Sequence, residues 1–313
     1  MNDKTISSIH DYRNSASHKD PNQRICRRWN PFGERLLDLL LKNDHNEMKK
    51  VDLETRKREK AHVTKEHIRK GLEQLGLKRG DIIGVHSSLS SFGYVDGGAE
   101  AVVDALLETV GEEGTIVMPT YSANRENVER TQREAELGVT WKSRILPYDP
   151  EKTPCWTGRI PETFRKRRNA VRSLDPTHSL AAIGPRANEL IEDWDRLLEA
   201  DGYILLLGVD LEACSAMHLA ERQVQLPPHI LRKTESPREL LKRYGEDLGW
   251  PEWDIGFGPY PDFAKMEEPC REHGIMKTVK IGEATVRLLK LRELIDLYAE
   301  YLRKDPDLFY GTK

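Results

Sequence analysis

From Val63 onward, polar and apolar residues follow two regular patterns. Apolar residues spaced three or four positions apart predict amphipathic helices from Thr64 to Gly76 and from Ala99 to Val110. Short continuous apolar runs predict buried strands over Ile82 to His86 and Thr115 to Met118. Strand, helix and strand in this order form a βαβ unit, which implies parallel pairing with a right-handed crossover.

The same patterns continue to the C-terminus. They predict helices over Ile160 to Arg168, Arg186 to Leu198 and from Met217 past Glu221, and strands over Leu180 to Gly184 and Ile204 to Gly208. Alternation over Thr278 to Leu291, interrupted at Gly282, is typical of a hairpin. A last helix is predicted around Leu294 to Leu302, ending before Pro306. We therefore expect an α/β fold, with a central, mostly parallel sheet flanked by helices and an additional C-terminal hairpin and helix.

Three segments lack a clear pattern. Residues 121–160 are polar, and a connection of that length is typical of a binding loop or lid. Residues 227–275 are rich in Pro, Trp and Gly and predict no definite element. Residues 1–62 form a charged N-terminal extension with one apolar patch, either a flexible arm with a packed helix or a lid or dimer arm. The chain thus divides into an extension, 1–62, and a main domain, 63–313.

Composition and charge narrow the classes of partner. The net charge is -3, from 49 basic and 52 acidic residues, so electrostatics favours neither nucleic acid nor an anionic membrane surface. No apolar run is long enough to span a membrane, and the N-terminus lacks the apolar core of a signal peptide. Four scattered cysteines, none in a Cys-x-x-Cys pair, favour reduced thiols and a cytoplasmic setting. The oligomeric state is left open.

Residues whose side chains could take part in catalysis or binding lie where three predicted strands lead into loops. These segments are Ile82 to Ser91, Arg172 to Ser179 and Leu205 to Glu221, and we expect them to converge on one site. The first leads through Gly93, Gly97 and Gly98 to a helix N-terminus. That arrangement suits an anion such as a pyrophosphate, or is ordinary turn chemistry.

Two carboxylate and imidazole pairs are candidates for proton transfer. Asp175 and His178 lie three residues apart on a turn fixed by Pro176, where a carboxylate can orient an imidazole and raise its basicity. His218 and Glu221 repeat the pair on a predicted helix. Each residue can instead be a cap or a satisfied polar contact. No third ligand at a recognisable spacing suggests a metal, so none is predicted. The absence of a Gly-x-Ser-x-Gly elbow disfavours an α/β-hydrolase.

Several blocks in order identify a family resemblance. They are Val85 to Leu89, Gly97 to Val102, Gly114 to Tyr121, Arg172-Ser173, Pro176 to Ser179, Gly184-Pro185, Leu206 to Val209 and His218 to Glu221. Together they resemble the aminoglycoside 3-N-acetyltransferase family over roughly residues 63–310. The resemblance implies an acetyltransferase of the non-GNAT type that moves the acetyl group of acetyl-coenzyme A (acetyl-CoA) to an amine of an aminoglycoside or related amino sugar. It implies direct attack in a ternary complex with general-base help.

The same resemblance implies roles for particular residues. Catalytic roles would fall to His178, Asp175, Glu221 and His86; acetyl-CoA contacts to His86, Ser87, Ser88, Leu89, Ser90, Ser91, Phe92, Gly93 and Ser179; and contacts to the small-molecule amine to Tyr121, Glu212, Ser215, His218 and Glu221.

The chain departs from the family pattern at two places. The family reads Arg-Ser-x-His-Pro with the histidine as base, and here that position is Asp175. Either His178 takes over, or Asp175 is the base with a pKa raised by burial, or the substrate is less demanding. Before His218 the family tends to have Asp-x-Asn-Thr, where this chain has Glu212, Cys214 and Ser215. Two alternatives therefore stay open: a catalytically weakened CoA-binding protein, and an acetyltransferase for a non-antibiotic amine.

Overall fold

The computed structural model describes residues 61–230 and 253–311. The predicted N-terminal extension therefore lies, except for its last two residues, outside the described part of the chain, as does most of the middle of segment 227–275. His62–Val63 forms a short strand, β1, that pairs in parallel with β3, Tyr94–Val95. This pairing ties the start of the described chain to the loop after the first long strand.

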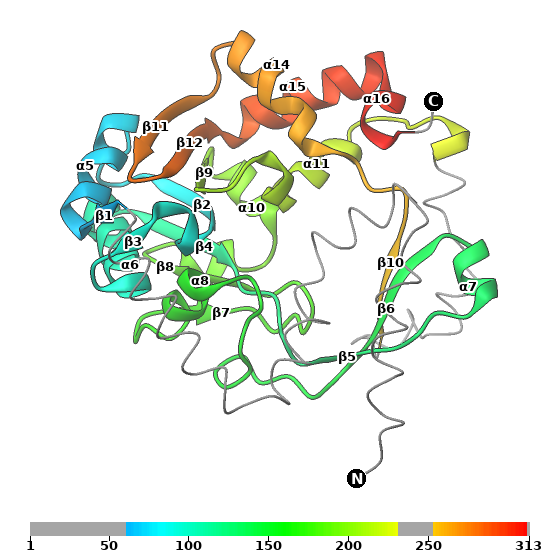
Figure 1. Cartoon of the computed structure of the whole chain (residues 1–313), viewed down its shortest axis with the longest axis horizontal. Coiled ribbons are helices and arrows are strands. Elements are labelled where there is room, and N and C mark those ends of the chain that lie inside the picture. Colours follow the sequence, from blue (N-terminus) through cyan, green and yellow to red (C-terminus); the bar gives the residue numbers. More distant parts are fainter. Residues whose placement is uncertain (1–60, 231–252, 312–313) are drawn as a thin grey trace, which may run out of the picture. The chain divides into compact units, whose positions relative to one another are not determined.

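A seven-stranded sheet forms the centre of the fold (Figure 1). Its order is β11 (Lys277–Ile281), β12 (Ala284–Lys290), β9 (Tyr203–Leu207), β2 (Ile82–Ser87), β4 (Thr115–Pro119), β8 (Leu180–Ile183) and β7 (Val171–Arg172). The α/β class, the C-terminal hairpin and the closing helix are confirmed. Within this sheet, parallel pairing is confined to the three central strands β9, β2 and β4, and its other pairings are antiparallel. The reason is connectivity, because only β2 and β4 are joined by a single helical crossover, whereas residues 120–179 separate β4 from β8.

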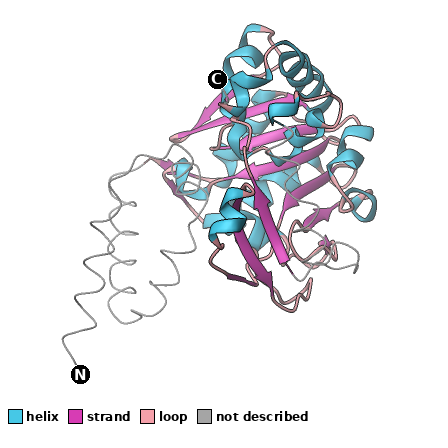
Figure 2. Ribbon diagram, turned by 90° about the vertical axis from the view of Figure 1, so that its right-hand side faces the viewer, coloured by secondary structure: helices cyan, strands magenta, loops and turns pink. Residues whose placement is uncertain are grey.

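Helices cover both faces of this sheet (Figure 2). On one face lie α5 (Lys65–Leu75), α6 (Gly98–Val110) and α8 (Arg159–Phe164). On the other lie α9 (Ala187–Leu190), α10 (Trp194–Glu199), α11 (His218–Glu221), α14 (Glu267–Glu272), α15 (Leu291–Lys304) and α16 (Pro306–Tyr310). A hydrophobic core lies between the sheet and the helices on each face, and alternate residues of a strand point into one core or the other. In β2, Ile83 and Val85 face the first group of helices, and Ile82 packs on the second.

Local sequence explains where the helices begin and end. Thr64 caps α5, because its hydroxyl accepts a hydrogen bond from the His67 amide, and Gly76 ends the helix in a left-handed conformation with φ of 100°. The single helix predicted over Arg186 to Leu198 is wrong, since the structure has two short helices. The Asp193 side chain accepts from the Arg196 amide and starts α10 afresh. Similarly, α11 ends at Glu221 and does not run past it.

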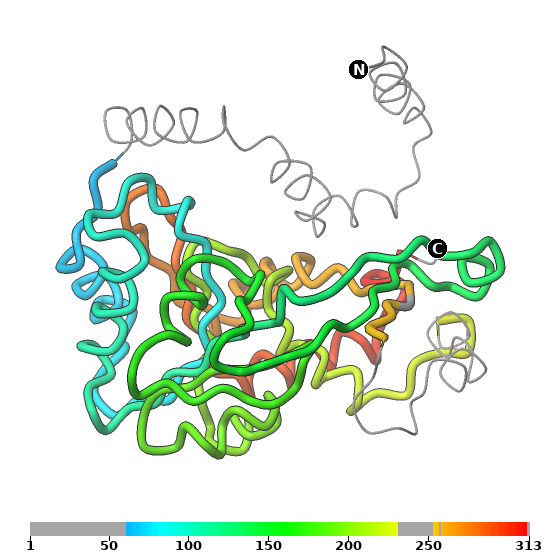
Figure 3. Tube along the Cα trace, turned by 90° about the horizontal axis from the view of Figure 1, so that it is seen from below, coloured from blue at the N-terminus to red at the C-terminus, as the bar shows by residue number. Residues whose placement is uncertain are grey.

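Two of the segments without a pattern meet in a second, smaller sheet. Strands β5 (Arg125–Asn127), β6 (Val139–Ile145) and β10 (Trp253–Phe257) pair antiparallel in the order β10-β6-β5, and α7 (Gln132–Glu136) connects the first two. In Figure 3 the green excursion of β5, α7 and β6 lies beside the orange β10. The segment 121–160 thus contains regular elements that its sequence did not predict, while its role as a binding loop or lid stays a prediction. Its partner strand comes from more than a hundred residues later, which local periodicity cannot reveal.

None of the helices in residues 61–230 and 253–311 combines the length and apolar character needed to cross a membrane.

Candidate functional site

Arg172 comes shortly before the turn Asp175 to His178, which we call the central turn. Its guanidinium donates hydrogen bonds to several loops and so holds them together. Its Nε donates to the hydroxyls of Thr120, at 3.1 Å, and Ser179, at 3.3 Å. The Nη1 group donates to the carbonyl of Thr153 at 2.5 Å, and Nη2 to that of Thr120. Ser179 is fully buried and its hydroxyl donates to the same Thr120 carbonyl at 2.7 Å. The guanidinium also lies over the Tyr148 ring, at 5.2 Å from its centroid. Arg172 thus sets the position of the turn that follows it.

Asp175 stabilises that turn. Its Oδ1 accepts hydrogen bonds from the Thr177 amide at 2.7 Å, the His178 amide at 2.8 Å and the Thr177 hydroxyl at 2.7 Å. Burial opposes ionisation, but these bonds outweigh it and hold the pKa of Asp175 below its ordinary value. This direction contradicts the option of Asp175 as a base with a raised pKa. A carboxylate already accepting three hydrogen bonds is a poor proton acceptor toward an ammonium group.

His178 is the exposed imidazole of the turn. Its Nδ1 lies 2.8 Å from the Thr177 hydroxyl, and its ring meets the Tyr121 ring edge-on at 5.1 Å between centroids. The Tyr121 hydroxyl donates to the Ser215 hydroxyl at 2.8 Å, and burial raises the pKa of this phenol. The structure therefore brings together His178, Tyr121 and Ser215, three residues predicted from widely separated positions.

His86 lies at the end of β2 and is only 4% exposed. Its ring stacks on the Trp194 indole with centroids 5.3 Å apart, and burial lowers the pKa of its imidazole to about 4. Trp194 and Tyr121 both pack against the apolar cluster that includes Leu180 and Leu190. His178 therefore contacts Tyr121, and His86 contacts Trp194, with both aromatic residues packed on one cluster. The pairing of β2 with β9 places the segments Ile82 to Ser91 and Leu205 to Glu221 side by side, and convergence of all three segments on one site stays a prediction.

The serine hydroxyls after His86 differ in their hydrogen bonding. Within the described residues, the Nε2 atom of His86 and the Oγ atom of Ser87 are buried without a hydrogen-bond partner. Because neighbouring residues of a strand point to opposite faces, these two groups do not point to one place. Ser91 donates to Ser88 at 2.9 Å, and Ser90 lies 3.3 Å from Ser88, all within or next to the 3₁₀ turn Leu89–Phe92.

Phe92 and Gly93 hold this loop on the body. The Phe92 side chain is fully buried in the core shared with α5 and α6, so it cannot contact a ligand. Gly93 has φ of 93°, and a Cβ there would lie 2.8 Å from the Ala61 carbonyl oxygen. Leu89, another predicted acetyl-CoA contact, packs on the same core. These three positions therefore shape the loop, and any ligand contact from Phe92 comes from its backbone.

Two carboxylates, those of Glu212 and Glu221, flank Ser215 in the chain. His218 Nδ1 and Glu221 Oε1 are 2.9 Å apart, and the His218 ring meets Phe263 edge-on at 4.8 Å. Glu212 carries a buried Oε2 atom with no hydrogen-bond partner in the described residues, and burial, followed by the charge of Asp262, raises its pKa. Burial and the charges of Glu221, Glu212 and Asp262 all raise the pKa of Tyr298. Such an anionic region suits an ammonium group.

Sequence reasoning missed a buried ion pair behind the turn. Arg125 of β5 and Asp254 of β10 lie 2.6 Å apart, with side chains only 13% and 9% exposed. Arg125 also donates to the Thr177 carbonyl at 3.3 Å and lies 5.8 and 6.0 Å from the ring centroids of Trp141 and Trp156. Burial raises the pKa of Asp254, and Arg125 partly offsets this. The only feature of the sequence that pointed to this buried pair was the presence of Trp141 and Trp156 in the segment 121–160.

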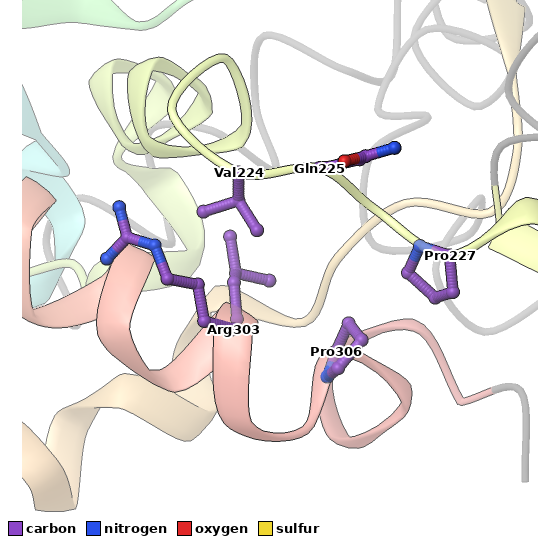
Figure 4. A pocket seen from close by; sticks show the side chains of 6 residues that line it. Val224, Gln225, Pro227, Arg303 and Pro306 are labelled. Atoms are coloured by element: carbon purple, nitrogen blue, oxygen red, sulfur yellow. The ribbon is translucent and has the colours of Figure 1, made fainter.

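Other features of the described chain lie outside this site. A groove after α11 is lined by Val224, Gln225, Pro227, Leu302, Arg303 and Pro306 (Figure 4). None of these is a predicted site residue. Among residues 61–230 and 253–311, no three His, Cys, Asp or Glu side chains are grouped so that they could hold a metal ion.

Comparisons with known proteins give one consistent result. The family model described as aminoglycoside 3-N-acetyltransferase matches residues 85–303. The SPbeta prophage-derived aminoglycoside N(3')-acetyltransferase-like protein YokD of Bacillus subtilis (strain 168) is 32% identical over 250 residues, covering 74% of this chain and 90% of that protein. Aminoglycoside N(3)-acetyltransferase VIII of Streptomyces fradiae is 29% identical over 273 residues, covering 77% and 92%. The crystal structure of aminoglycoside acetyltransferase AAC(3)-IVa as apoenzyme superposes with a TM-score of 0.62 at 25% identity, covering 80% of this chain and 92% of that one.

Proposed function

Because this chain belongs to the aminoglycoside 3-N-acetyltransferase family, we propose that it transfers the acetyl group of acetyl-CoA to an amine of an aminoglycoside or related amino sugar. Membership of the family makes the protein an acyltransferase. The resemblance and the enzyme class expected from the sequence are thereby confirmed, with acetyl-CoA as the acetyl donor of the family. The acceptor, the residue roles and the cytoplasmic setting stay proposals.

The proposed reaction is a direct attack in a ternary complex. The neutral amine nitrogen of the acceptor attacks the thioester carbon, a C–N bond forms, and the C–S bond breaks to release CoA as its thiolate, which becomes the thiol when His178 gives up the proton it has taken from the nitrogen. His178 takes the proton that the nitrogen loses. It suits this role because it is exposed and its hydrogen bond within the described residues uses Nδ1 and leaves Nε2 available, whereas Asp175 is engaged by three donors. His86, neutral at physiological pH because of its low pKa, would lie near the thioester with the serines that follow it.

The acceptor would bind on the carboxylate side. One observation carries the proposal: His178 lies against Tyr121, and the Tyr121 hydroxyl donates to Ser215, which stands in the chain between Glu212 and Glu221. A polyamine sugar placed there would have its ammonium groups held by carboxylates and one amine directed at the base. Glu221 also orients His218, which makes that imidazole a second contact for the sugar.

The first test removes the proposed proton-transfer pair. The double variant Asp175→Ala, His178→Ala should lower kcat at least about a hundredfold, the low end for general-base catalysis. Release of CoA thiol is followed with a chromogenic disulfide in the presence of acetyl-CoA and a panel of aminoglycosides and simpler amines. His273→Ala, an exposed histidine that contacts Tyr301 instead, is the matched control and should keep the wild-type rate. A double variant with the wild-type rate would contradict the assignment.

The same assay separates the alternatives. If the wild type binds CoA tightly but releases no thiol with any amine, the protein is a binding member of the fold. Turnover with simple amines and none with aminoglycosides would point to a non-antibiotic acceptor. The Glu212→Gln variant then tests the amine site, and we expect a higher KM for the amine with an unchanged KM for acetyl-CoA.

A further inference from the structure

Three polar groups of the central turn form an unbroken line. The carboxylate oxygen Oδ1 of Asp175 lies 2.7 Å from Oγ1 of Thr177, and this hydroxyl lies 2.8 Å from Nδ1 of His178. Thr177 is buried, with 6% of its surface exposed, whereas the imidazole beyond it is exposed. The hydroxyl therefore lies between a carboxylate and a ring nitrogen, and it has a single proton for the two of them.

The geometry decides where that proton goes. Suppose that the Thr177 hydroxyl donated to His178: its lone pairs would then face the Asp175 oxygen across 2.7 Å with no proton between them. Two oxygens so placed repel, the more so because the carboxylate is charged. Donation to Asp175 removes the repulsion and makes a charge-assisted hydrogen bond. The hydroxyl oxygen then becomes the acceptor for His178, so Nδ1 must carry a hydrogen.

We propose that Thr177 is a positioning residue, which relays the Asp175 carboxylate to His178 and fixes the neutral imidazole as the tautomer protonated at Nδ1. This inference rests on the proposed function, because it assigns Nε2 of His178 as the atom that accepts the proton of the attacking amine. When Nε2 takes that proton, the positive ring keeps its Nδ1–H bond to Thr177, and the hydroxyl keeps its bond to the carboxylate. No proton leaves Thr177 or Asp175 during the step.

The relay also gives a role to the aspartate that replaces the family's histidine. The Asp175 Oδ1 accepts both the Thr177 and His178 amides, and its side chain makes no hydrogen bond to the His178 ring within the described residues. The hydroxyl of Thr177 bridges the gap. Other groups that face His178 are the Tyr121 ring and the Asp254 carboxylate, itself paired with Arg125. Asp254 also favours a positive ring, so the pH profile alone does not isolate Thr177.

The test therefore reads the tautomer directly. Protein labelled with ¹⁵N-histidine is studied by NMR above the titration range, and the His178 signals are assigned by their loss in His178→Gln. In the wild type we expect a protonated Nδ1 and an unprotonated Nε2. Thr177→Val has almost the same shape but lacks the hydroxyl, and it should shift His178 toward the Nε2–H form. Thr177→Ser restores the hydroxyl and should restore the wild-type signals.

Kinetics supplies the second readout. Thr177→Val should lower kcat about tenfold or more, as expected for losing a hydrogen bond to a charged ring, and leave the KM for acetyl-CoA within about twofold. Thr177→Ser should recover kcat to within about threefold. A wild-type His178 protonated at Nε2 would overturn the relay, as would a folded Thr177→Val enzyme with wild-type kcat. A wild type that shows the Nδ1–H tautomer but acetylates no amine supports the relay and rejects the proposed function. If Thr177→Val does not fold, the tautomer of His178 in the wild type and the NMR signals and kcat of Thr177→Ser still test the relay.

Discussion

The ion pair between Arg125 and Asp254 joins the smaller sheet to the turn that holds Asp175, Thr177 and His178. Its two side chains are almost fully buried, and Arg125 also donates to the Thr177 carbonyl. We consider the variants Arg125→Met and Asp254→Asn, alone and together, because each removes a charge and puts in a side chain of similar size. Because the pair links β5 to β10 and both to the turn, its loss should weaken the whole smaller sheet.

The magnitude follows from burial. Breaking a buried pair by removing one partner typically costs about 3–5 kcal/mol of unfolding free energy. Arg125→Met also loses two ring contacts with Trp141 and Trp156, each worth about 0.5–1 kcal/mol. The pKa of Asp254 is already raised by burial, so the stranded carboxylate would take up a proton, which limits the cost. We therefore expect about 3 kcal/mol for Arg125→Met and about 2 kcal/mol for Asp254→Asn, where Arg125 keeps the Ser122 and Thr177 carbonyls.

The double variant makes the test sharp. Its cost should fall short of the sum of the single costs by about 2 kcal/mol, the coupling energy of the pair. Urea unfolding of the four proteins measures this cycle. The pair Arg79 and Glu113, 2.8 Å apart but 65% and 63% exposed, is the control and should show much weaker coupling. Costs that add to within about 0.5 kcal/mol would refute the argument, since they would mean that the two charges do not stabilise each other.

Two further predictions concern stability. Burial lowers the pKa of His86 from 6.5 to about 4, so between these values the unfolded chain binds a proton that the folded chain does not; stability is therefore lost as pH falls, by about 2 kcal/mol from pH 7 to pH 5. Urea unfolding at both pH values should show that this part of the loss is absent in His86→Gln, and an identical pH dependence would contradict the assignment. Gly184→Ala should cost more than about 2 kcal/mol, because φ is +133° and the new Cβ would lie 2.3 Å from the Gly114 carbonyl oxygen. Gly98→Ala, at φ of +60° with nothing within 4 Å, is its control, and equal losses in thermal unfolding would show that the close approach does not matter.

Much of the main domain could be predicted because its elements are locally encoded. The helix α5 follows from apolar spacing with Thr64 and Gly76 as its limits, and the hairpin follows from alternation around Gly282. The break between α9 and α10 could not be predicted from periodicity, since the apolar pattern continues across it and the Asp193 cap decides it. The antiparallel outer strands were missed for a related reason, because the direction of a strand depends on the path of the chain that leads to it.

The candidate site shows the same division. The sequence by itself determined which residue types stand at the strand ends, that Asp175 replaces the usual histidine, and to which family the chain belongs. Only the tertiary structure decided what those residues do: Asp175 accepts three hydrogen bonds within its own turn, His178 meets Tyr121, and Arg125 and Asp254 support the turn from behind. The physical reason is that periodicity and capping act over a few residues. The pKa of a carboxylate, in contrast, depends on burial and on donors that the folded chain brings to it.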